Sequence, residues 1–253
     1  DLRIFGDRNF VIGCINVIVF GIIIYAPIFL LPVYLGEVRR IGPWEIGIMV
    51  SVMGMASMVI GPFVGILLNF FGPRFLIISG CLFAIIGTWQ LSFLTSEFGF
   101  EELFLPQVLR GIGSQLLWIG NQYLAMQFVL QGGIQNAASV FNLVLRGGGA
   151  VSIAIANIFL EKLSFISYGD ISNIVSDGPQ IISGIKQKME GLFSSLPMIS
   201  NLDPNYKTII AAEMLGQREG FIIAVNNIMF TIVWIALIPI ILIPLCKREV
   251  KNN

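Results

Sequence analysis

Long apolar runs alternate with short polar breaks along most of the chain. The runs cover residues 11–35, 44–68, 75–94, 103–129, 137–160 and 221–246. A helix needs about 20 apolar residues to cross the roughly 30 Å hydrocarbon core of a bilayer, and each run approaches or exceeds that length. The pattern therefore predicts an all-α polytopic membrane protein, a helix bundle with six transmembrane helices.

One polar stretch, residues 161–220, is much longer than the other breaks. Apolar residues recur within 181–196 at helical spacing, which predicts an amphipathic helix lying on the membrane surface. Asp203 followed by Pro204 is typical of a helix start, so a second helix is expected to begin there and run into the last span. Two roles stay open for this stretch: a lid or docking surface, and a plain ordered loop.

Composition places the chain among integral membrane proteins. Hydrophobic residues make up 56% of the chain and charged residues 12%, with a mean hydropathy of +0.85. Soluble proteins usually contain about a quarter charged residues. The net charge is zero, so no nucleic-acid partner is expected. Histidine is absent and the three cysteines lie in different apolar runs, which argues against a metal site, a disulfide framework or a bound cofactor.

The distribution of basic residues predicts the orientation. Cytoplasmic loops and termini of membrane proteins are enriched in lysine and arginine. Six basic residues fall on one side of the predicted topology: Arg3, Arg8, Arg74, Lys247, Arg248 and Lys251. The short loops on the other side contain Arg39 and Arg40 and most of the acidic residues. Both termini are therefore expected in the cytoplasm, and residues 161–220 on the extracytoplasmic side.

The break between the second and third runs contains a recognisable spacing. Residues 65–74 read GILLNFFGPR. This resembles the loop motif of the major facilitator superfamily, G-x-L-small-D-x-x-G-basic-basic. Four positions match: Gly65, Leu67, Gly72 and Arg74. Asn69 stands where the family has aspartate and Pro73 replaces a basic residue, which is how a degenerate second copy of the motif looks.

The glycines of this region suggest two structural roles. Gly65 lacks a side chain and is interpreted as a point where two spans approach closely, and the same is expected along the second span at Gly47, Gly54 and Gly61. Gly72 is expected to adopt a positive φ in the turn between two helices. Arg74 is expected in the headgroup zone.

Three further stretches strengthen the resemblance. They read PQVLRGIG at residues 106–113, FNLVLRGGG at 141–149 and GQREGFIIAVNNIMF at 216–230. Together with the loop motif, they look like the second half of the fourteen-span drug/proton antiporters, the EmrB/QacA-like branch of the superfamily. The resemblance covers residues 1–253 and implies the C-terminal six-helix half of a major facilitator fold.

The resemblance also implies a function. It predicts a secondary active transporter of the cytoplasmic (inner) membrane, working by alternating access in proton-coupled efflux of drugs or other amphipathic small molecules. The expected partners are the lipid bilayer, a small-molecule substrate, protons, the N-terminal transporter half and a periplasmic adaptor protein. No carboxylate lies deep in a predicted span, so proton-coupling carboxylates are expected in the other half.

Polar residues inside the spans are the candidates for a substrate pathway, because such residues are costly in lipid and usually face the bundle or a cavity. The set comprises Arg110, Arg146, Gln107, Gln115, Asn121 and Asn142. Other readings remain for the two arginines: Arg110 snorkels to the outer headgroups, and Arg146 closes a cytoplasmic gate through helix-end carbonyls. Gln122, Asn157 and Asn226 either line the pathway or bridge helices.

The residues favour transport over other functions. A membrane-embedded enzyme is disfavoured, because the chain has no histidine, no acid deep in a span and no nucleophile and base pairing. A non-transporting fragment or subunit that needs a separate N-terminal half remains open, and so does a transporter of another small solute.

Overall fold

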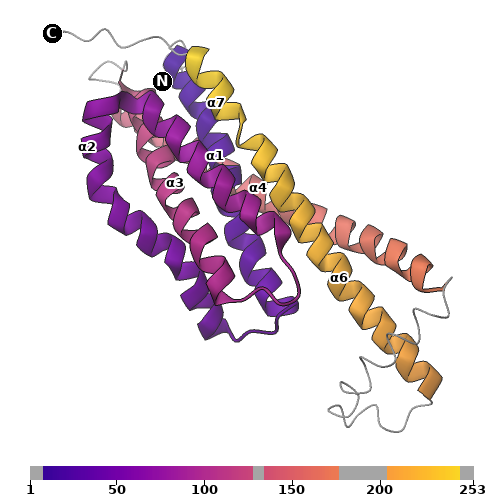
Figure 1. The fold of residues 1–253 in the computed structure, drawn as a ribbon. Coiled ribbons are helices and arrows are strands. Elements are labelled where there is room, and N and C mark those ends of the chain that lie inside the picture. Colours follow the sequence, from indigo (N-terminus) through magenta and orange to yellow (C-terminus); the bar gives the residue numbers. More distant parts are fainter. Residues whose placement is uncertain (1–7, 128–133, 177–203, 246–253) are drawn as a thin grey trace.

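The computed structural model describes residues 8–127, 134–176 and 204–245. Within these residues the chain is helical and contains no strand, which confirms the predicted all-α class. The long helices are α1 (Arg8–Glu37), α2 (Pro43–Gln90), α3 (Phe100–Met126), α4 (Ile134–Ser176) and α6 (Pro204–Ile235). Three short elements complete the order: η2 (Leu91–Phe93), α7 (Ile238–Leu242) and η5 (Ile243–Leu245). Figure 1 shows their arrangement.

Helix α2 consists of two arms that meet at Gly72. This residue has φ 77° and ψ 170°, which is not helical backbone. Figure 1 shows α2 turning and running back beside its own first part. We call residues 43–71 the first arm and residues 73–90 the second arm. The expected positive φ at Gly72 is confirmed, and Pro73, which needs no N–H partner at a helix start, follows it directly.

Four stretches are long and apolar enough to cross a membrane by length and composition: Phe10–Glu37, Pro43–Phe93, Gln135–Ser164 and Gly216–Leu242. The second of these contains both arms of α2. Helix α3 carries Glu101, Glu102 and Arg110 and is not among the four. A membrane helix bundle is therefore supported, while the number of six spans stays a prediction.

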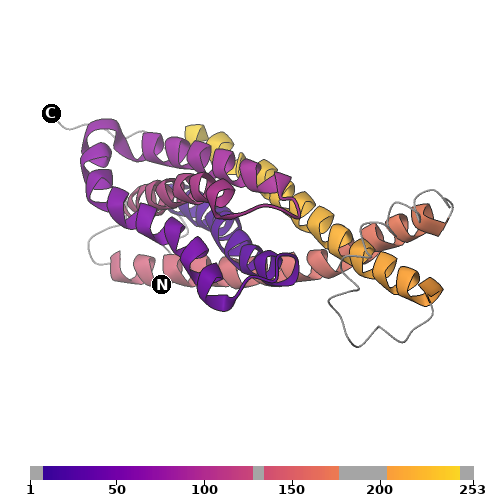
Figure 2. The ribbon, with the colours of Figure 1, turned by 60° about the horizontal axis from the view of Figure 1, so that its bottom comes forward.

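One element boundary differs from the sequence interpretation, and another agrees with it. Helix α4 continues past residue 160 to Ser176, because the change from apolar to polar residues ends the apolar run but no proline follows to end the helix. Helix α6 begins at Pro204 and continues into the last apolar run, as predicted. The two ends of residues 161–220 are therefore helical, as parts of α4 and α6. The amphipathic helix expected over 181–196 lies outside the described residues. Figures 1 and 2 show that α4 and α6 extend together past the other helices at one end.

The helix over the last apolar run is interrupted near its end, although the run keeps the length and composition of a membrane span. Helix α6 ends at Ile235 and α7 begins at Ile238. Pro239 explains the break, since proline has no N–H to donate and its ring clashes with the carbonyl four residues earlier, here that of Ile235. Helix α1, by contrast, continues through both Pro27 and Pro32.

Helix α1 is the central helix of the bundle. In its apolar window 67% of the residues are buried inside the protein, against 39% or less in the other three candidate spans. It contacts α2, α3, α4 and α6. Many of its side chains are almost completely buried, including Val17, Leu30 and Leu35. Side chains on α1 are therefore the ones most constrained by packing.

Helix α3 packs closely against both arms of α2. A Cβ added at Gly111 would lie 2.4 Å from the Met53 carbonyl oxygen on the first arm. One at Gly113 would lie 2.7 Å from the Gly80 oxygen and from the Ala84 nitrogen on the second arm. Glycine therefore lets three helical segments approach in the way that small residues allow in membrane proteins.

The glycines singled out on the second run do not have this role, and that interpretation is wrong for the described packing. A Cβ at Gly47, Gly54 or Gly65 would meet nothing within 4 Å. At Gly61 the nearest atom, Nε2 of Gln115, is 3.5 Å away, an ordinary contact. The physical reason is orientation: α3 contacts the face of the first arm that carries Met53, whereas Gly47, Gly54 and Gly65 point away from every described residue.

Candidate functional site

Arg110 is buried between α3 and the second arm of α2. Its side chain is 1% exposed, and its Nη1 donates a hydrogen bond of 2.8 Å to Oε1 of Gln107, one turn earlier. A Cβ at Gly87 would lie 2.7 Å from Cγ of Arg110, so this glycine makes room for the arginine stem. Nε and Nη2 have no hydrogen-bond partner among the described residues. Such burial does not fit an arginine that snorkels to the headgroups.

A second polar group joins the first arm of α2 to α3. Oγ of Ser57 donates to the carbonyl oxygen of Gly111 at 2.9 Å and lies 3.1 Å from Oγ of Ser114. Sequence reasoning missed both serines. The signal available was the presence of small hydroxyl residues in apolar runs, which commonly hydrogen bond across membrane helices.

Two asparagines are completely buried without hydrogen-bond partners in the described part of the chain. Asn121 of α3 and Asn16 of α1 are each 0% exposed, and neither amide makes a hydrogen bond to a described residue. Asn121 was a candidate from sequence, whereas Asn16 was missed although it interrupts an apolar run. Both are polar side chains inside the bundle, as expected for residues that are costly in lipid.

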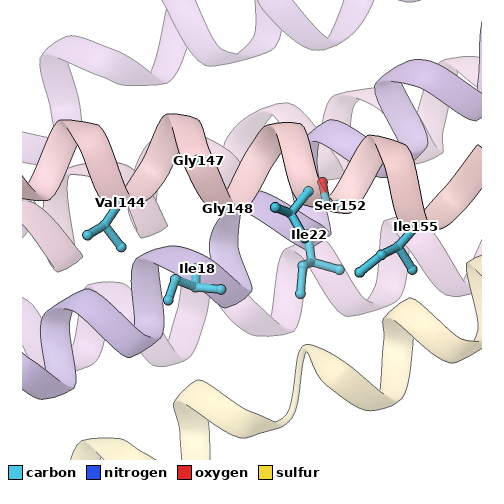
Figure 3. A pocket seen from close by; sticks show the side chains of 8 residues that line it. Ile18, Ile22, Val144, Gly147, Gly148, Ser152 and Ile155 are labelled. Carbon is cyan, nitrogen blue, oxygen red and sulfur yellow. The ribbon is translucent and has the colours of Figure 1, made fainter.

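An apolar pocket of about 390 Å³ lies between α1 and α4 (Figure 3). It is lined by Ile18, Ile22, Val144, Gly147, Gly148, Val151, Ser152 and Ile155. The hydroxyl of Ser152 is engaged, because it donates to the Gly149 carbonyl at 2.7 Å. The pocket can therefore hold an apolar group and offers no free hydroxyl of its own.

The three glycines after Arg146 differ in their surroundings. A Cβ at Gly149 would lie 2.6 Å from the ring of Tyr25, and one at Gly148 would lie 3.3 Å from Cα of Ile18. At Gly147 a Cβ would meet nothing within 4 Å. Gly148 and Gly149 thus bring α4 against α1, and Gly147 leaves space at the pocket.

The two remaining candidates, Arg146 and Asn142, lie on α4. Arg146 is exposed and directly precedes the pocket residue Gly147. Asn142 is half-buried and donates to the carbonyl of Ala138 on its own helix at 2.9 Å. Of the six pathway candidates, only Gln107 and Arg110 are hydrogen bonded to each other within the described structure. The structure therefore separates the candidates into a set on α3 and a pair on α4.

The loop motif contributes to packing beside the turn between the two arms of α2. Leu67 packs against a small buried cluster formed by Val64, Leu76 and Leu116. Asn69 is exposed and Arg74 is half-buried. Together with the turn at Gly72, this motif joins the two arms of α2.

At the opposite end of the second arm, side chains from α1, from the loop after α1 and from α6 contact the connection to α3. The hydroxyl of Tyr34 donates to the carbonyl of Thr95. Arg39 donates to the Ser96 carbonyl at 2.8 Å, and Arg218 lies 3.4 Å from the same oxygen. These side chains were not candidates from sequence, because their partners are backbone carbonyls that leave no pattern in the residues.

Comparison with known proteins identifies the family of this chain. The profile of the family described as the Major Facilitator Superfamily matches residues 2–153, which is more than half of the chain. The chain belongs to the major facilitator superfamily. Its apolar helices agree with this membership and make it an integral membrane protein.

Within the superfamily, the chain is similar to proteins named for drug export or drug resistance. This major facilitator chain is 32% identical over 164 residues to the colistin resistance protein EmrB of Acinetobacter baumannii, covering 65% of the chain and 32% of the relative. It is 20% identical over 229 residues to the multidrug export protein EmrB of Haemophilus influenzae, covering 90% and 43%. It is 20% identical over 238 residues to the probable multidrug resistance protein EmrY of Escherichia coli, covering 93% and 46%. The expected similarity to EmrB-like transporters is confirmed, and the chain spans less than half the length of these relatives.

Proposed function

We propose that this chain is part of a secondary active transporter that exports drugs or other amphipathic small molecules in exchange for protons. The observation that carries the proposal is the similarity to relatives whose names state drug export or resistance, within a superfamily of transporters. We propose that the pocket between α1 and α4 is one of the places where the chain contacts its substrate.

The pocket suits an amphipathic molecule. Its wall is apolar, which favours the hydrophobic part of a substrate. The exposed cation of Arg146 directly precedes the pocket residue Gly147 and favours an anionic or hydrogen-bonding group. We propose that these two features contact the substrate together, while Arg110 and Gln107 act deeper in the bundle.

The proposed substrate contact can be tested in a complete transporter. Arg146→Gln is expected to reduce export of anionic amphipathic compounds more than export of neutral ones, because only the charge beside the pocket is lost. Lys162→Gln removes another exposed cation from α4, away from the pocket, and serves as the matched control. Equal effects of the two substitutions on anionic and neutral compounds would contradict the role of Arg146.

We propose that a second, N-terminal half covers the open face of the first arm of α2. Large apolar side chains gather there: Met55, Met58, Val59 and Phe63 are 65%, 82%, 70% and 54% exposed. A second six-span repeat would bury them and supply the other wall of a site between two repeats. A periplasmic adaptor is a further proposed partner, suggested by the family resemblance alone.

Two preparations separate transport by the chain from transport by an assembly. The purified chain, reconstituted alone in liposomes, is expected to show no proton-driven movement of substrate, because alternating access needs two repeats. Co-reconstitution with an N-terminal half is expected to restore it. Transport by the chain alone, in liposomes where crosslinking detects no homodimer, would show that no second half is needed. Absence of transport in the assembly would reject the transport function in favour of a non-transporting subunit.

We propose six spans with both termini in the cytoplasm of the inner membrane, formed by α1, the two arms of α2, α3, α4, and α6 with α7. Single cysteines at Ser96 and Ser176 are expected to react with a membrane-impermeant thiol reagent from outside, whereas one at Asn252 is expected to be protected. Reaction at Asn252 but not at Ser176 in intact cells would reverse the orientation.

A further inference from the structure

Helices α1 and α3 pack against each other over residues 13–20 of α1 and 118–125 of α3. Two close approaches define the register of this packing. A Cβ at Gly13 would lie 2.7 Å from Cβ of Ala125. The rings of Phe20 and Trp118 have centroids 6.1 Å apart. The residue number rises along α1 as it falls along α3, so the helices are antiparallel here.

Asn16 and Asn121 lie in the middle of these two segments. Asn16 lies three residues after Gly13 and four before Phe20. Asn121 lies three residues after Trp118 and four before Ala125. Residues three or four apart share one face of a helix, so both asparagines lie on the faces in contact and at the same level. The register therefore places the two residues at about the same level, on the facing sides of α1 and α3.

The four polar atoms of this pair have no partner in the described protein. Each residue is 0% exposed, and Oδ1 and Nδ2 of both side chains make no hydrogen bond to a described residue. Buried amides without hydrogen bonds are strongly unfavourable, and more so where lipid rather than water surrounds the bundle. Two such amides at one level point to a ligand with complementary hydrogen-bonding groups.

We propose that Asn16 and Asn121 form a small polar site in the α1 and α3 interface that binds one water molecule bridging the two amides. Each amide offers a carbonyl acceptor and an NH₂ donor, and a water can accept from one amide while it donates to the other. Buried waters typically make two to four such bonds. A hard cation fits poorly, because the pair supplies two carbonyl oxygens where such ions take about six or more oxygen ligands.

This site is independent of the transported substrate and of the proposed function. Its ligand is solvent, and its residues hold two helices of one bundle together. The inference can therefore fail while transport is confirmed, and it can hold if the chain proves to be a non-transporting subunit.

A mutant cycle tests whether the two amides act as one unit. Asn16→Leu and Asn121→Leu are each expected to lower the thermal unfolding midpoint of the purified full chain in detergent by about 3 °C or more, because each leaves the opposite amide without its bridge. The double variant removes both polar groups and is expected to recover most of the loss. Asn157→Leu, at an exposed position of α4, is the control and is expected to change the midpoint little. Additive losses in the double variant would overturn the pairing.

A second measurement separates a bridging water from direct amide bonding. Hydroxyl radicals made by X-ray radiolysis of a bound water oxidise the side chains beside it. Phe20, one turn from Asn16 and only 6% exposed, is expected to be labelled in the wild-type chain. Its labelling rate is expected to fall at least threefold in the double leucine variant. Equal labelling of Phe20 in the two proteins, or none in the wild type, would overturn the water site.

Discussion

Asn226 of α6 holds the backbone of Leu94 by two hydrogen bonds. Nδ2 of Asn226 donates to the Leu94 carbonyl at 2.9 Å, and the Leu94 N–H donates to Oδ1 at 3.0 Å. Leu94 follows η2, where the helical hydrogen bonds of the second arm of α2 end. A side-chain amide suits this position because it offers one donor and one acceptor. The pair fastens α6 to the connection between α2 and α3, so Asn226 bridges segments far apart in sequence.

Loss of this amide is expected to destabilise the bundle. Asn226→Leu removes both bonds and leaves the polar backbone of Leu94 without its partner, which typically costs about 1–3 kcal/mol. Asn227→Leu, at the exposed neighbouring position, is the matched control. Unfolding in detergent, followed by loss of helical signal, compares the two. Equal stability of both variants would show that the contact contributes nothing.

Gly72 is expected to tolerate no side chain, whereas Gly65 is expected to accept one. At φ 77° and ψ 170° the backbone of Gly72 lies in a region that is essentially limited to glycine, so Gly72→Ala should cost about 1–3 kcal/mol. Gly65→Ala meets nothing within 4 Å and lies within a helix, where the change should stabilise by about 0.5–1 kcal/mol. Unfolding midpoints check both signs. A neutral Gly72→Ala would mean that the turn can adopt another geometry.

The glycines at the pocket are expected to respond unequally to the same substitution. Gly149→Ala places a methyl group 2.6 Å from the ring of Tyr25, which forces α1 and α4 apart and should cost about 1–3 kcal/mol. Gly147→Ala adds its methyl group to open space within a helix, so, like Gly65→Ala, it should stabilise by about 0.5–1 kcal/mol. The free energy of unfolding of each variant measures the difference. Similar losses at both positions would contradict the close contact at Gly149.

The start of α3 is expected to be sensitive to acid through Glu102. Its own backbone N–H and that of Gly99 bond the carboxylate, the latter at 2.8 Å, and lower the pKa of Glu102 below its ordinary value of 4.5, with a further contribution from the charge of Arg39. Because the folded pKa is the lower one, the stabilisation is fully present above pH 4.5 and is lost as the pH falls through the folded pKa.

Glu102→Gln tests this expectation. The variant should be less stable than the wild type at pH 7, and the difference should shrink as the pH falls below 4.5. Glu101→Gln, at the exposed neighbouring position, controls for the loss of one negative charge. A difference between wild type and Glu102→Gln that does not vary with pH would exclude the ionised carboxylate as the stabilising form.

Sequence alone determined the features of this protein that depend on local chemistry. The apolar runs predicted where helices lie, because burial of a run in a membrane requires length and composition only. The turn at Gly72 and the start of α6 at Pro204 follow from backbone restrictions of single residues. The family resemblance rested on the same short stretches and was confirmed.

Tertiary structure decided which of the glycines and polar residues in the apolar runs contact another helix. Gly111 and Gly113 contact both arms of α2, whereas Gly47 and Gly54 face open space, although all four stand in apolar runs. A helix in lipid is apolar on every side, so its sequence carries only a weak signal for the face that meets another helix. Asn226 hydrogen bonds to Leu94, and the proposed water site combines Asn16 with Asn121. The members of each pair are about a hundred positions apart or more, so they come together only when the helices pack.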